Sequence, residues 1–127
     1  MTTITPNGDA TERALSQYKA YIEASIASGD VSREVGQLTN DILATALRFA
    51  ASSLDRGGEY VDVVIGFDVA MAACVASVLD SLAKSGRANR YALLARHVQN
   101  VSQIVTESWA SDDFIVESAV TPEGGTA

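Results

Sequence analysis

The stretch YVDVVIGFDVAMAACVASVLDSL, from Tyr60 to Leu82, decides the fold of this chain. Its apolar residues recur at steps of three and four, the spacing that places them on one side of an α-helix. The first stripe consists of Tyr60, Val64, Phe67, Met71, Val75, Val78 and Leu82, and the second of Val61, Ile65, Ala72, Ala76 and Leu79, interrupted by Asp68. Together they cover about half of the helix circumference. We therefore predict a central helix that several neighbours cover.

The beginning of this stretch, residues 60–67, has a second interpretation. It is rich in Val, Ile and aromatic residues, which are common in strands. The helical spacing runs through it without interruption to Leu82. We therefore expect a helix rather than a strand.

Three further segments carry helical spacing between capping residues and glycines. Asp9 and Glu12 form a capping box for the first helix, after a turn at residues 6–8, and Gly29 ends that helix. Asp30 or Ser32 caps the second helix, residues 56–58 stop it, Gly86 ends the third, and Asn89 caps the fourth. The faces expected to be buried are Leu15, Tyr18, Ile22 and Ile26 in the first helix, Val35, Leu38, Ile42, Ala46, Phe49 and Ala50 in the second, and Tyr91, Leu94, Val98, Val101, Val105 and Trp109 in the fourth.

Four helices with short connections predict an all-α, four-helix up-and-down bundle. We expect a flexible N-terminal arm at residues 1–8, the helical bundle domain at residues 9–111 and an acidic C-terminal tail at residues 112–127. The length of 127 residues is typical of one domain.

Composition favours a cytoplasmic protein. The chain has one cysteine, Cys74, which excludes an internal disulfide, and its apolar neighbours predict a buried, inert thiol. The first nine residues lack the basic and apolar runs of a secretory signal. The longest uncharged apolar stretch, residues 69–79, is too short to span a bilayer, so we expect no membrane contact.

Charge is segregated along the chain, whose net charge is −7. Lys84, Arg87, Arg90 and Arg96 stand together, whereas the residues after Arg96 contain acids and no Lys or Arg. The ordinary interpretation of this pattern is a soluble acidic surface. The alternative is that the basic turn meets an acidic surface on a sister subunit or on another protein. The acidic balance makes nucleic acid an unlikely ligand, because binding it depends on neutralising phosphates.

Asp68 is an aspartate within an apolar stripe. A buried carboxylate must be paired or protonated, and Arg48 on the second helix is the expected partner. The alternative is that the second stripe is a subunit interface with Asp68 at its rim.

Catalytic and cofactor patterns are missing from the sequence. One histidine, His97, and one cysteine cannot supply the ligands of a zinc site. No nucleophile elbow and no phosphate-binding glycine loop occur. We therefore expect neither metal nor cofactor, and no enzyme.

Arg90 and His97 suggest one exception, because seven residues place them on the same side of a helix. The pair resembles the Arg-x4–6-His element of HEPN-type ribonucleases, although Tyr91 replaces the polar residue usual after the arginine. The resemblance implies binding and cleavage of an RNA phosphodiester by these two residues.

The sequence thus predicts a non-enzymatic helical module for protein–protein interaction, homo-oligomeric, acting as an assembly adaptor, regulatory subunit or inhibitor. The alternatives are a HEPN-like ribonuclease or its inactive relative, and an acidic decoy of a nucleic-acid-binding surface. The residues expected to bind the partner are Asp68, Lys84, Arg87, Arg90, Trp109 and the apolar triplet Phe114, Ile115 and Val116. The alternative for the triplet is that it docks on the bundle of its own chain.

Overall fold

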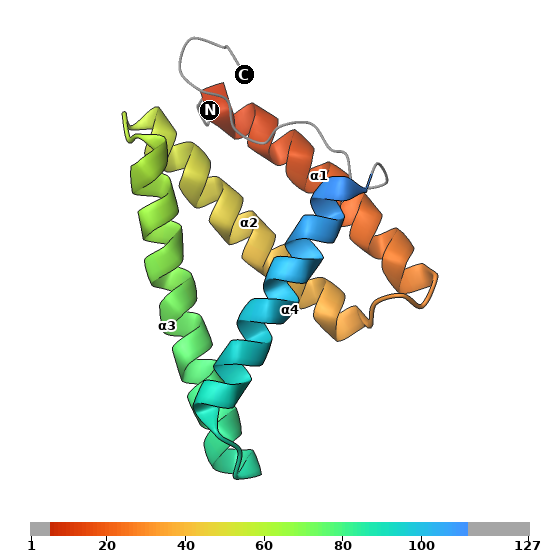
Figure 1. The fold of residues 1–127 in the computed structure, drawn as a ribbon. Coiled ribbons are helices and arrows are strands. Elements are labelled where there is room, and N and C mark those ends of the chain that lie inside the picture. Colours follow the sequence, from red (N-terminus) through yellow and green to blue (C-terminus); the bar gives the residue numbers. More distant parts are fainter. Residues whose placement is uncertain (1–5, 112–127) are drawn as a thin grey trace. The chain divides into compact units, whose positions relative to one another are not determined.

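The computed structural model describes residues 6–111, which form four helices and, over this range, no strand. They are α1 (Pro6–Ala27), α2 (Arg33–Asp55), α3 (Tyr60–Gly86) and α4 (Arg90–Ala110) (Figure 1). Helices account for 88% of the described residues. The all-α, four-helix fold is therefore confirmed, and residues 60–67 are helical as expected. The acidic tail, with Phe114, Ile115 and Val116, lies outside the described residues.

The start of α1 differs from the prediction. The helix begins at Pro6, so residues 6–8 are its first residues rather than a turn in the arm. Proline is favoured at the first helical position, where its missing N–H has no helical acceptor in any case. Asp9 consequently lies in the first turn and not at the cap, and the expected capping box with Glu12 was wrong.

The other helix ends follow the sequence closely. Gly29 has a positive φ of 82° after α1, and Gly57 has one of 89° after α2. Ser32, rather than Asp30, caps α2, because its side chain accepts a hydrogen bond from the backbone N–H of Val35 at 3.2 Å. Asn89 caps α4 and accepts from the N–H groups of Tyr91 and Ala92 at 2.8 and 3.2 Å.

The chain divides into two compact units, and the boundary falls within α3, after Val64. The described part of the first unit contains α1, α2 and the first turn of α3, and that of the second contains the rest of α3 and all of α4.

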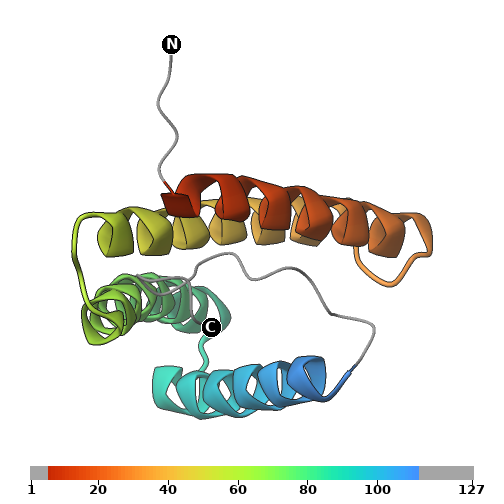
Figure 2. The same cartoon turned by 90° about the horizontal axis from the view of Figure 1, so that it is seen from above.

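In the first unit, α1 and α2 form an antiparallel hairpin whose helices run side by side (Figures 1 and 2). The buried residues of this hairpin are small apart from Ile22: they are Ala10, Thr11, Ala14, Gly36 and Ala51. A Cβ atom added at Gly36 would lie 2.5 Å from Cδ1 of Ile26 and 3.1 Å from Cγ2 of Ile22. Small side chains thus allow the two backbones to approach.

The face of α2 that was expected to be buried is not the one that meets α1. Val35, Leu38, Ile42 and Phe49 are exposed, whereas Gly36 and Ala51 on the adjacent side are buried. The widest apolar stripe of α2 is therefore not the side that packs on α1, because close packing selects the side with glycine and alanine.

In the second unit, α3 and α4 are joined by residues 87–89, here called the elbow. Arg87 adopts a left-handed conformation with φ of 55°, and the N–H of Ala88 donates to the carbonyl of Ala83 at 2.9 Å. This is the hydrogen-bond pattern of a helix that ends in a tight reversal. From the elbow the two helices spread apart (Figure 1).

Candidate protein-binding surface

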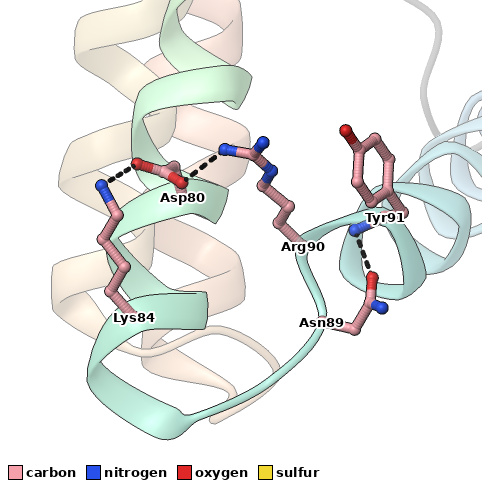
Figure 3. A network of polar contacts seen from close by, with 5 residues as sticks. All are labelled: Asp80, Lys84, Asn89, Arg90 and Tyr91. Carbon is pink, nitrogen blue, oxygen red and sulfur yellow. Dashed lines mark hydrogen bonds and ion pairs between the residues drawn. The ribbon is translucent and has the colours of Figure 1, made fainter.

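A polar cluster holds α3 and α4 together at the elbow. The Asp80 carboxylate contacts Lys84 Nζ at 2.8 Å and accepts a hydrogen bond from Arg90 Nη1 at 3.0 Å (Figure 3). The Arg90 guanidinium also lies over the Tyr91 ring, 5.4 Å from its centroid. The hydrogen bond from Lys84 and then that from Arg90 hold the pKa of Asp80 below its usual value.

The sequence did not lead us to predict a role for Asp80 in this surface. Lys84 and Arg90 were expected to offer free positive charge to a partner, but both contact this carboxylate. A signal was present, because Asp80 and Lys84 are four residues apart on one helix, the spacing of a favourable ion pair. Within the described chain, Arg87 forms no ion pair, so it is the free cation of the elbow.

Next to this cluster lies an apolar crevice of about 410 Å³ between α3 and α4. Its apolar lining consists of Ala72, Val75, Ala76 and Leu79 from α3 and Tyr91 and Leu94 from α4, with Asp80 and Arg90 at one end. Three of these α3 residues belong to the second stripe, so this stripe lies toward α4 near the elbow. Small side chains on the α3 wall leave room for inserted apolar groups.

The apolar residues of α4 continue beyond the crevice. The α4 stripe consists of Tyr91, Leu94, Val98, Val101, Val105 and Trp109, and all six are exposed. Trp109 is 84% exposed and Tyr91 is 69% exposed. Large contiguous apolar patches on a protein surface usually mark contact sites. The helix expected to bury this stripe therefore presents it as an accessible surface.

The first stripe of α3 is also largely accessible. Its members Phe67, Val78 and Leu82 are exposed, and the centres of the two stripes lie about 100° apart around the helix. Cys74 is exposed too, so the predicted buried thiol was wrong. Its apolar neighbours in sequence belong to a helix whose side chains remain largely accessible.

Arg48, the expected partner of Asp68, is engaged by another carboxylate within its own unit. The Arg48 guanidinium makes a bidentate contact with Glu12 on α1, with Nε–Oε1 at 2.8 Å and Nη2–Oε2 at 3.1 Å. The hydrogen bond from Arg48 lowers the pKa of Glu12. Asp68 is exposed, so its carboxylate needs no buried partner.

Among the described residues, α3 is the helix that is long and apolar enough to cross a membrane by length and composition. An 18-residue window within it has a mean hydropathy of 2.0, and none of that window is buried. Asp68 in the same helix opposes insertion, since an aspartate at a bilayer centre costs about 2.5–3.5 kcal/mol. Binding experiments must therefore distinguish a lipid bilayer from a protein as the ligand of this apolar surface.

Arg90 and His97, the two residues that resemble a ribonuclease element, have different surroundings on α4. Arg90 is engaged by Asp80 and stacks on Tyr91, while His97, seven residues further along α4, is half-buried. Over residues 6–111, no three His, Cys, Asp or Glu side chains gather where they could hold a metal ion.

A second groove, of about 540 Å³, lies between α1 and α2 and is mostly polar. Its charged lining includes the paired residues Glu12 and Arg48, together with Lys19, Glu23 and Asp41. Two of these charges already neutralise each other. The crevice between α3 and α4 is therefore the better candidate for binding an apolar segment of a protein.

No known protein family matches the chain, and no curated protein or solved structure is detectably similar to it.

Proposed function

We propose that the chain is a non-enzymatic helical module that binds protein chains, its own copies included, through the α3–α4 hairpin. One observation carries the proposal: Tyr91 and Leu94, which line the apolar crevice, belong to the exposed α4 stripe that continues to Trp109. Tyrosine and tryptophan are the residues most enriched at the energetic centres of protein interfaces. The module acts as an adaptor, regulatory subunit or inhibitor in a reducing, cytoplasmic setting.

The cluster around Asp80 supports this function by fixing the hairpin. A contact site works best when its walls are held in place before binding, since ordering them on binding costs free energy. Asp80 and Arg90 connect the two walls of the crevice next to the elbow.

Filling the crevice tests the proposal. Ala76→Trp places a large ring in it, and Ala70→Trp places the same ring about 120° away on α3, on an exposed residue outside the crevice lining. Tagged full-length protein is incubated with lysate of its source cells, and bound proteins are quantified by mass spectrometry. We expect Ala76→Trp to reduce capture of a specific protein at least tenfold and Ala70→Trp to leave it unchanged.

Equal capture by both variants would reject the crevice as the binding site. Flotation of the purified protein with phosphatidylcholine vesicles, equal for both variants, would assign the apolar surface to lipid instead. Cleavage of RNA by the wild type that is lost in His97→Ala would replace the proposal with the HEPN-like reading.

A further inference from the structure

The apolar residues of the α4 stripe are spaced so that the stripes of two copies can pack against each other. The inner members Leu94, Val98, Val101 and Val105 are separated by steps of four, three and four, which read the same in both directions. Two such stripes laid antiparallel about a two-fold axis near residues 99 and 100 bring Val98 beside Val101 of the other copy. The same register pairs Leu94 with Val105.

The ends of the stripe match as well. In this register Tyr91 of one copy lies beside Trp109 of the other, so the two most exposed aromatic residues of α4 cover each other. Two-fold contacts require a surface that is complementary to itself in this way. The antiparallel register satisfies that requirement along the whole of α4.

Charge on α4 favours the same arrangement. Arg90 lies in the first turn and Glu107 in the last, which opposes the helix dipole at both ends. An antiparallel neighbour places the basic start of one helix beside the acidic end of the other. The free cation Arg87 lies at the basic end, and the acidic residues Asp112 and Asp113 follow the acidic end.

From these observations we infer that the occupant of the α3–α4 hairpin is a second copy of the chain, with the two α4 helices antiparallel and each α4 stripe covered by its symmetry mate. This deepens the proposed function and rests on it. The helix of 21 residues is about 31 Å long. Its six exposed side chains bury roughly 500 Å² per copy, with aromatic rings of about 200 Å² each contributing most.

That area lies just below the range of stable interfaces, which bury roughly 600–1,000 Å² per partner. We expect the dimer to dissociate in the micromolar range, although buried area alone does not set affinity. Walls contributed by α3 around the crevice add to the contact without changing the register.

Two matched variants test which face of α4 forms the dimer contact. Val98 and Ile104 are aliphatic and similarly exposed, at 58% and 61%, but they lie about 120° apart around the helix. We expect Val98→Glu to weaken dimerisation at least tenfold by sedimentation equilibrium and Ile104→Glu to change it less than threefold. A melting curve of each variant confirms that the chain still folds.

Disulfide trapping tests the register in the full chain, with Cys74→Ser to remove the native thiol. A mixture of Leu94→Cys and Val105→Cys chains should form the mixed disulfide at least tenfold faster than Leu94→Cys forms its own. Faster Leu94–Leu94 linkage would show a parallel pair and overturn the inference. So would a monomer in which Val98→Glu lowers only the melting temperature.

These results separate the inference from the proposed function. If the chain stays monomeric while Ala76→Trp still abolishes capture of another protein, the second copy is wrong and the binding crevice stands. Suppose instead that Val98→Glu and Ile104→Glu change dimerisation as expected, but that no other protein is captured whose binding Ala76→Trp reduces. Self-association is then the function of the hairpin.

Discussion

The Asp80 carboxylate on α3 accepts a hydrogen bond from the Arg90 guanidinium on α4, with 3.0 Å between Oδ1 and Nη1. The other carboxylate oxygen contacts Lys84 at 2.8 Å. One side chain thus neutralises two of the three cations around the elbow and joins the two helices that line the crevice. The elbow is therefore a polar clamp as well as a turn.

Acid should weaken this clamp. The pKa of Asp80 is lowered in the fold by Lys84 and Arg90, so its stabilising effect is present at neutral pH and is lost as pH falls through that lowered pKa, below about 3.9. Asp80→Asn should lower the melting temperature slightly at pH 7, and its difference from wild type should be smaller near pH 2. Thermal melts by circular dichroism at both pH values check this, and a constant difference would contradict it.

Gly36 should resist large substitutions because α1 packs directly over it. Gly36→Leu forces Ile26 and Ile22 to move and should reduce the free energy of unfolding by about 1–3 kcal/mol. Gly86→Leu is the control, since an added Cβ there meets no atom within 4 Å. Urea denaturation of both variants measures the effect. Because leucine has a higher helix propensity than glycine, Gly86→Leu should not lower the free energy of unfolding, and equal losses in both variants would show that packing over Gly36 does not set the cost.

Arg87 holds a conformation that costs a non-glycine residue about 1–2 kcal/mol. Arg87→Gly should therefore raise the free energy of unfolding by about 1 kcal/mol. Arg87→Ala keeps the positive φ without relief and should give no such gain. If both variants respond alike in urea denaturation, the loss of charge rather than backbone strain is responsible.

The acidic tail should strengthen association without supporting the fold. In the antiparallel pair, residues 112–127 of one copy follow the helix end that lies beside Arg87 of the other. Deleting these residues should weaken the dimer, reduce its sensitivity to salt and leave the melting temperature of the monomer unchanged. Sedimentation at low and high salt measures both effects. Unchanged assembly after the deletion would remove Phe114, Ile115 and Val116 from the binding surface.

Helix caps and glycine turns were predictable from the sequence because each depends on residues that are close together in the chain. Ser32 and Asn89 cap helices through their own side chains, and Gly29 and Gly57 take positive φ values that glycine tolerates. The helical period through residues 60–67 correctly outweighed their strand-like composition.

Partners distant in sequence were not predictable. Arg48 pairs with Glu12, 36 residues away, rather than with Asp68, because the antiparallel hairpin of α1 and α2 places them together. Periodicity shows that a side of α2 is apolar, but it does not say which side a neighbour covers. Small residues such as Gly36 decided that, and hydrophobicity scales give them little weight.

Sedimentation equilibrium of the wild-type chain from 1 to 200 micromolar tests the central claim most directly. Pairing through the α4 stripe predicts that the measured mass rises with concentration from 13.3 kDa to twice that value, with a midpoint in the micromolar range, and goes no higher. A mass of 13.3 kDa at every concentration would contradict it.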